Sequence, residues 1–130
     1  MPAHTILIID DDRLTRLSIS TVLGRAGHRV EEAASGKDGL SRIAEVRPAV
    51  VLADIALPDM DGFAVLRAVH AQHPTLPVIL MSADATAAMA RDAVRQGAFA
   101  WLDKPCDPAE LEAVIARVVQ LTAASDQALA

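Results

Sequence analysis

The stretch TILIIDDDRLTRL, residues 5–17, joins an apolar run to three consecutive carboxylates. The run from Ile6 to Ile9 has no polar face, which is typical of a strand buried on both sides of a parallel sheet. Asp10, Asp11 and Asp12 follow directly, where such a strand would leave the core. Like charges crowded together repel one another, and partial burial raises that cost. The three aspartates therefore indicate a site where something compensates their charge.

Strand-like and helical patterns alternate along the rest of the chain. Strands are expected at residues 5–9, 29–33, 49–53, 77–81 and 99–102. Helical spacing with one buried face is shown by Ile19, Val22, Leu23 and Ala26, and again by Leu111, Val114, Ile115 and Val118. Further helices are expected at residues 36–46, 61–72 and 84–96. Pro108 suits the first turn of the last helix, where its missing N–H is not needed.

Five strands that are each followed by a helix predict one α/β domain with a parallel sheet covered on both faces. The right-handed crossovers leave few topologies. We predict a doubly wound (βα)5 flavodoxin-like sheet with strand order 2-1-3-4-5. In such a sheet, ligands bind beyond the carboxyl ends of the strands, at the switch point between strands 1 and 3.

Composition limits the classes of function. The chain has 130 residues and a net charge of −5, so we expect no direct binding of nucleic acid or of an anionic membrane by this domain. Cys106 is the only cysteine, which excludes an internal disulfide. No signal segment or membrane span is recognisable, and we expect a cytoplasmic protein. Residues 1–121 are expected to form the domain, and residues 122–130 a frayed tail.

Residues of complementary chemistry follow four of the expected strands. Asp10 and Asp11 follow the first, Asp54 the third, Ser82 the fourth and Lys104 the fifth. Facing carboxylates without a nearby His or Cys ligand favour a hard divalent cation, Mg²⁺ above all. A lysine and a serine opposite that ion can bind the oxygens of a phosphoryl group. The sequence therefore predicts a magnesium-dependent site for phosphoryl chemistry.

Four motifs carry a resemblance to a known family: ILIIDDD, VVLADIALPDMDGF, PVILMSA and WLDKP. In this order and spacing they resemble the receiver domains of response regulators in two-component signalling, over about residues 4–121. The resemblance implies that Asp54 is the phosphoacceptor and attacks a phosphohistidine of a partner. That partner would be a sensor histidine kinase or a phosphotransfer protein.

The resemblance also implies a role for each site residue. Mg²⁺ would be held by Asp11, Asp54 and the backbone carbonyl of Ala56, while Asp10 would act mainly through a bound water. Lys104 would bind phosphoryl oxygens, next to a cis peptide bond to Pro105. Ser82 and the backbone N–H groups of Ala56 and Ala83 would complete the phosphate site.

Switching is the remaining implication of the resemblance. Ser82 and Trp101 would move together on phosphorylation and change the surface formed by helix 84–96, strand 99–102 and the last helix. A downstream effector protein or domain would read this surface, and a homodimer is a further option. The domain would be no enzyme beyond its own phosphotransfer and dephosphorylation. The residues leave open whether it acts alone or within a longer protein.

Other interpretations compete with these assignments. A flavin carrier would need a Ser-, Thr- and Gly-rich first loop instead of three acids. An Mg²⁺-dependent aspartyl phosphatase could use a similar acid set, but Ala56 stands where its general acid is needed. A degenerate receiver scaffold would lack part of the acceptor, metal and lysine set. Asp12 is read as a helix N-cap, and Asp59 and Asp61 as residues that shape the turn before the third helix. Cys106 is read as an apolar filler.

Overall fold

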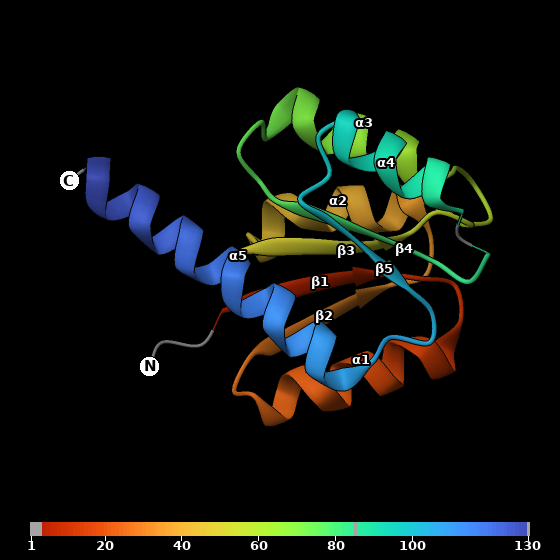
Figure 1. The fold of residues 1–130 in the computed structure, drawn as a ribbon, viewed down its shortest axis with the longest axis horizontal. Helices are drawn as coiled ribbons and strands as arrows, with labels where there is room; N and C mark the ends of the chain where they lie inside the picture. Colours follow the sequence, from red (N-terminus) through yellow and green to blue (C-terminus); the bar gives the residue numbers. More distant parts are fainter. Residues whose placement is uncertain (1–3, 85, 130) are drawn as a thin grey trace.

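The computed structural model describes residues 4–84 and 86–129, and side chains up to residue 121. Five parallel strands form one sheet in the order β2-β1-β3-β4-β5 (Figure 1). The strands are β1 (Thr5–Ile9), β2 (Arg29–Ala33), β3 (Val50–Asp54), β4 (Val78–Ser82) and β5 (Ala100–Asp103). The helices are α1 (Arg13–Arg25), α2 (Gly36–Val46), α3 (Gly62–Gln72), α4 (Ala87–Arg95) and α5 (Pro108–Leu129). The predicted doubly wound topology is confirmed.

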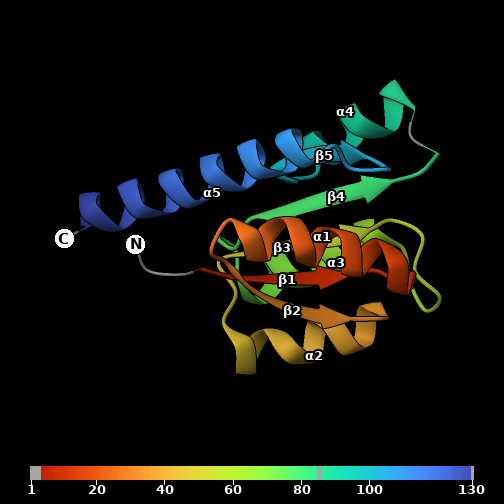
Figure 2. The same ribbon diagram turned by 90° about the horizontal axis from the view of Figure 1, so that it is seen from below.

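Helices cover both faces of the sheet (Figures 1 and 2). On one face, Ile6, Ile8 and Met81 pack in a buried cluster with residues of α1 and α5. On the other face, Leu7 and Ile9 belong to a second cluster, which includes residues of α2, α3 and α4. Successive strand residues point to opposite faces, so an uninterrupted apolar run fills both clusters.

Strands β3, β4 and β5 are shifted by about one residue from their expected positions. Asp54 and Ser82 are the last residues of β3 and β4 and do not follow them, and Asp54 pairs in register with Met81. The pairing with neighbouring strands extends through these polar residues because their side chains point into the site while their backbones stay in the sheet. Two site residues therefore lie on the rigid sheet.

Short polar residues determine where the helices begin. Asp12, Ser35, Asp61 and Thr86 accept a backbone N–H at the starts of α1, α2, α3 and α4. Because Thr86 is the cap, α4 begins at Ala87 and is shorter than predicted. Gly97, with φ of +110°, follows α4 in the left-handed conformation that ends many helices.

Helix α5 continues to the last residue that the structure describes. The helix begins at Pro108 as expected but continues to Leu129, through the segment that we expected to fray. Residue 130 lies outside the described residues. Alanine and leucine are frequent in this segment and favour helix, so intrahelical hydrogen bonds continue where the apolar periodicity is lost. The extension projects past the sheet on the side where the strands begin (Figure 1). None of the helices in the described part of the chain combines the length and hydropathy of a membrane crossing.

Candidate functional site

The carboxyl ends of β1, β3 and β4 bring three buried polar side chains together. Asp10 is fully buried, and Asp54 and Ser82 are 6% and 3% exposed. The backbone N–H of Asp10 donates to the carbonyl of Ala33, which fixes the exit of β1. These residues lie at the switch between β1 and β3, where the topology predicts a ligand site.

A cluster of carboxylate oxygens forms at this switch. Asp10, Asp11 and Asp54 each offer one oxygen, and the three oxygens lie within 4.8 Å of one another. Asp11 is exposed, whereas the other two are buried. Asp10 Oδ2 is buried, and the ammonium of Lys104 is its one polar contact among the described residues. An oxygen-only donor set with an incompletely satisfied buried oxygen fits a hard divalent cation such as Mg²⁺.

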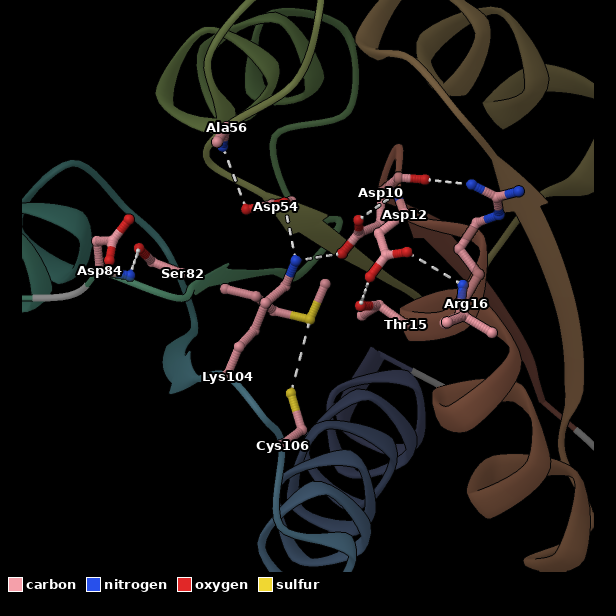
Figure 3. Close-up of polar contacts among 12 residues, drawn as sticks. Asp10, Asp12, Thr15, Arg16, Asp54, Ala56, Ser82, Asp84, Lys104 and Cys106 are labelled. Carbon is pink, nitrogen blue, oxygen red and sulfur yellow. Dashed lines mark hydrogen bonds and ion pairs between the residues drawn. The ribbon is translucent and has the colours of Figure 1, made fainter.

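Lys104 supplies the positive charge that holds this cluster together (Figure 3). Its Nζ lies 2.5 Å from Asp10 Oδ2 and 2.8 Å from Asp54 Oδ2. The backbone N–H of Lys104 donates to the carbonyl of Ser82, and the peptide bond to Pro105 is cis, as the resemblance implies. The lysine thus reaches from the β5 side of the sheet to both buried acids.

The pKa values follow from burial and from this pairing. Burial raises the pKa of Asp10 above its ordinary value, although the hydrogen bond and charge of Lys104 oppose the rise. Burial alone would lower the pKa of Lys104, but its hydrogen bonds and charge interactions with Asp10 and Asp54 outweigh that effect and raise it. The ammonium therefore stays charged at neutral pH.

Backbone N–H groups orient the carboxylates. Asp54 Oδ1 accepts the N–H of Ala56 at 3.1 Å, and Asp10 Oδ1 accepts the N–H of Asp12 at 2.9 Å. Ser82 Oγ accepts the N–H of Asp84 at 3.1 Å (Figure 3). Each interaction holds a polar side chain in one orientation at the end of a strand.

Arg16 is a contributor that the sequence did not indicate. Its Nη1 donates to the carbonyl of Asp10 at 2.6 Å, and its Nε pairs with Glu32 Oε1 at 3.0 Å. The guanidinium thus connects α1 and β2 to the peptide that carries Asp10 into Asp11. In the sequence, the position of Arg16 about one turn into the first helix was the one hint of this role. Arginine is common at such positions, so the hint does not single it out.

The other acids lie outside the cluster. Asp12 caps α1, and its hydrogen bond from Thr15 is the main cause of its lowered pKa. Asp61 caps α3, in agreement with the sequence-based interpretation. Asp59 differs from that interpretation: it accepts the N–H groups of Gly36 and Lys37, at the start of a different helix. These hydrogen bonds, Lys37 first, lower the pKa of Asp59.

Trp101 lies on β5, and Cys106 follows Lys104 and Pro105. The half-buried indole packs against the apolar cluster under α3 and α4, and its Nε1 donates to Asp103 Oδ1 at 3.0 Å. Cys106 Sγ lies 3.9 Å from Met81 Sδ, and burial raises the pKa of its thiol. A raised pKa disfavours the reactive thiolate, as expected of an apolar filler. Ala83, the remaining predicted phosphate contact, is exposed beside Ser82.

Together, these groups offer a nucleophilic carboxylate, an ammonium, a hydroxyl and an oxygen cluster for a cation. The sequence model of one family, described as the response regulator receiver domain, matches residues 6–116. The chain belongs to this family.

Relatives of the receiver domain are regulatory proteins of bacteria. It is 39% identical over 118 residues to the regulatory protein AtoC of Escherichia coli K12, covering 91% of this chain and 26% of AtoC. It is 37% identical over 119 residues to the DNA-binding transcriptional regulator NtrC of Salmonella typhimurium, covering 92% of this chain and 25% of NtrC. The receiver domain therefore spans about a quarter of the length of these relatives.

Solved structures agree with the fold. The chemotaxis response regulator CheY4 of Vibrio cholerae superposes with a TM-score of 0.83 at 29% identity, covering 90% of this chain and 99% of CheY4. NtrX of Brucella abortus gives a TM-score of 0.90 at 29% identity, covering 98% of this chain and 29% of NtrX. The receiver domain is thus similar both to a protein of about its own length and to part of a longer one.

Proposed function

We propose that this receiver domain accepts a phosphoryl group on Asp54 in a magnesium-dependent reaction. The observation that carries the proposal is the contact of Asp54 with Lys104 inside the cluster formed with Asp10 and Asp11. A carboxylate that is buried, hydrogen-bonded and next to an ammonium can act as a nucleophile and have the resulting charge neutralised.

The metal would be bound by Asp10, Asp11, Asp54 and the backbone carbonyl of Ala56, with Asp10 acting mainly through water. The oxygen cluster supports this assignment. Mg²⁺ keeps several positions for water and phosphate oxygens, and it supplies charge neutralisation when bound. The exposed carboxylate of Asp11 leaves the ion accessible from solvent and from a partner.

The phosphoryl oxygens would be bound by groups on the other side of Asp54. Lys104 would provide its ammonium and Ser82 its hydroxyl, and Ala56 and Ala83 would provide backbone N–H groups. The N–H of Ala56 already donates to the Asp54 carboxylate. On transfer, this donor would turn to a phosphoryl oxygen without a large movement of the loop.

The donor would be a phosphohistidine of a sensor histidine kinase or of a phosphotransfer protein. An Asp54 oxygen attacks phosphorus, the phosphorus–nitrogen bond breaks, and the histidine nitrogen takes back the electron pair. The product is an acyl phosphate on Asp54. The side chains of the domain contribute mainly position and charge to such a transfer. Later hydrolysis returns the free carboxylate, so we class the domain as a switch and not as an enzyme with an external substrate.

The output would be read from the surface formed by α4, β5 and α5, where Trp101 lies next to the site. Ser82 would move toward the phosphoryl group, and Trp101 would follow into the space under α4. An effector protein or domain, or a second copy in a homodimer, would bind the altered surface. DNA binding, which the name of the relative NtrC states, would belong to such an effector and not to this acidic domain. We place the reaction in the cytoplasm, which suits a chain with the single cysteine Cys106.

Acetyl phosphate labelling tests the proposal. Incubation with acetyl phosphate and Mg²⁺ should add one phosphoryl group to the intact mass, and EDTA should suppress the addition. Asp54→Asn should abolish it, whereas Asp61→Asn, an equal change of charge in the same loop, should retain labelling. Labelling of the Asp54 variant would show that another residue is the phosphoacceptor. Turnover of phosphate monoesters, which are not phosphodonors for the proposed receiver, would indicate an aspartyl phosphatase, and no labelling of folded protein would indicate a degenerate scaffold.

A further inference from the structure

The loop between β3 and α3 is fastened to the start of α2 by one carboxylate. Asp59 Oδ1 accepts the N–H of Gly36 at 2.9 Å, and Asp59 Oδ2 accepts the N–H of Lys37 at 2.8 Å. The first N–H groups of a helix have no partner inside the helix. Ser35, the N-cap of α2, accepts the N–H of Asp38. Asp59 accepts the two N–H groups of the first turn that Ser35 does not. We call this contact of Asp59 with Gly36 and Lys37 the Asp59 clamp.

Close packing supports the clamp independently. Gly36 is buried, and a Cβ atom added there would lie 2.5 Å from Met60 Cγ and 2.7 Å from Met60 Sδ. Met60 therefore occupies the space that a side chain at Gly36 would need. The loop is attached to α2 both by hydrogen bonds and by this contact, across 22 residues of sequence.

The clamped loop also carries the peptide group of Ala56. Its N–H donates to Asp54 Oδ1 at 3.1 Å, and Ala56 pairs with Asp61 in an isolated antiparallel bridge. The N–H of Gly62 closes the base of the loop on the carbonyl of Ile55 at 3.0 Å. Leu57 and Met60 are half-buried against the core cluster on this face, whereas Ala56, Asp59 and Asp61 are exposed. The Asp59 clamp adds a polar anchor to this packing and restricts the exposed part of the loop.

We propose that Asp59 is a positioning residue for the phosphorylation site. By anchoring the loop to α2, it keeps the Ala56 peptide in place for its two roles toward the metal and the phosphoryl group. A loop ordered in advance loses less entropy when it binds a ligand. This inference rests on the proposed function, since the value of an ordered Ala56 peptide depends on what binds there.

Asp59→Asn tests the clamp with little change of shape. Asparagine keeps one acceptor oxygen but places an NH₂ group against the second backbone N–H. We expect the amide hydrogens of Gly36 and Lys37 to exchange at least tenfold faster. We also expect the Kd for Mg²⁺, measured by calorimetry on the folded protein, to rise by about tenfold, the lower end for residues that orient metal ligands. Labelling by acetyl phosphate should slow at limiting Mg²⁺ and recover at saturating Mg²⁺.

Asp38→Asn is the matched control. It also replaces a carboxylate near the start of α2 by an amide, and it leaves the Asp59 clamp intact. Its Mg²⁺ affinity should stay within twofold of the wild type. Gly36→Ala places a Cβ atom in the space that Met60 occupies. It should displace the loop and also weaken Mg²⁺ binding. Since both changes release one loop, the double variant should lose less affinity than the product of the two single losses.

Two outcomes would overturn the role of Asp59. Faster exchange at Gly36 and Lys37 with unchanged Mg²⁺ affinity would make Asp59 a cap of α2 only. Unchanged exchange in Asp59→Asn would show that the clamp does not hold the loop. Labelling of wild-type Asp54 is scored separately: its absence would overturn the proposed function, while the Mg²⁺ titration still decides the role of Asp59.

Discussion

At the scale of single residues, the three consecutive aspartates have three different roles. Asp10 is buried and paired with Lys104, Asp11 is exposed at the carboxylate cluster, and Asp12 caps α1. Their identical chemistry hides this difference in the sequence. Burial and the direction of each side chain separate the roles, because the chain turns from a strand into a helix within these residues.

Asp11 and Asp12 should therefore respond differently to the same substitution. Asp11→Ala should weaken Mg²⁺ binding at least tenfold with little change in melting temperature, because it removes an exposed ligand. Asp12→Ala should lower the melting temperature by a few degrees through loss of the helix cap, with Mg²⁺ affinity almost unchanged. Calorimetric titration and thermal unfolding measure the two effects. Equal losses of Mg²⁺ affinity would mean that the metal is bound by a different set of acids.

At the scale of elements, helix α2 lies close to strand β1 at one glycine. Gly39 is buried, and a Cβ atom added there would overlap the side chain of Ile9 in β1. Gly24 in α1 has nothing within 4 Å of the same position and is exposed. Two glycines inside helices thus have opposite surroundings, and their substitution separates close packing from helix propensity.

Gly39→Ala should reduce the free energy of unfolding by about 1–3 kcal/mol, because fully buried Ile9 cannot move away. Gly24→Ala should increase it by about 0.5–1 kcal/mol, because alanine favours helix and meets no neighbour. Urea unfolding of both variants measures the two effects. A stabilised Gly39 variant would show that α2 can move away from β1.

Trp101 on β5 is a natural fluorescent probe of switching. The indole of Trp101 is half-buried and hydrogen-bonded to Asp103, and it is the only tryptophan. If phosphorylation draws Trp101 inward, Mg²⁺ with beryllofluoride, a mimic of the phosphoryl group, should change its fluorescence. Ser82→Ala should reduce the change, and Asp54→Asn should abolish it. Constant emission with fully modified Asp54 would exclude Trp101 as the switch.

At the scale of the whole molecule, the site lies at one end of the sheet and α5 projects beyond the other (Figure 2). Buried acids lie at the carboxyl ends of the strands, and Lys104, directly after β5, compensates their charge. Because Asp10 and Asp54 lie at the ends of neighbouring strands, their pairing with Lys104 joins the centre of the sheet to its β5 edge. The charge of this lysine therefore contributes to the stability of the entire domain.

Stability should fall in alkaline solution as Lys104 loses its proton. Its pKa is raised above the ordinary value of 10.5, after the partners outweigh the opposite effect of burial. A base with a raised pKa stabilises the folded state below its unfolded pKa, and this contribution is lost as the pH rises through the folded pKa. We expect the free energy of unfolding to decline above pH 10.5, and Lys104→Met to remove that part of the decline.

Besides Lys104, the side chains that titrate in alkaline solution are Lys37 and the Cys106 thiol, so the measurement is made in a Cys106→Ala background. The chain has no tyrosine, and its two lysines are Lys37 and Lys104. Lys37→Met, at an exposed position, is the matched control and should keep the alkaline decline. Urea unfolding at a series of alkaline pH values measures it. The same slope in the Lys104 variant and the wild type would contradict a stabilising role for the ammonium.

The sequence by itself determined the fold and which residues meet at the site. Uninterrupted apolar runs alternate with helical spacing, and this local periodicity leaves few packings other than a parallel sheet with helices on both faces. In such a sheet, the residues that end the strands must meet at one edge. Asp10, Asp54, Ser82 and Lys104 could therefore be placed together before any coordinates, as could the family to which they belong.

Only the tertiary structure decided how the site is supported. Arg16 reaches the carbonyl of Asp10, and Asp59 binds the start of α2 and not its own turn. These contacts join segments whose relative position depends on how the helices pack on the sheet. No periodicity records that position, because a single arginine or aspartate fits many local surroundings equally well. The sequence therefore specifies which groups meet at the site, and the packing of distant segments specifies what holds them in place.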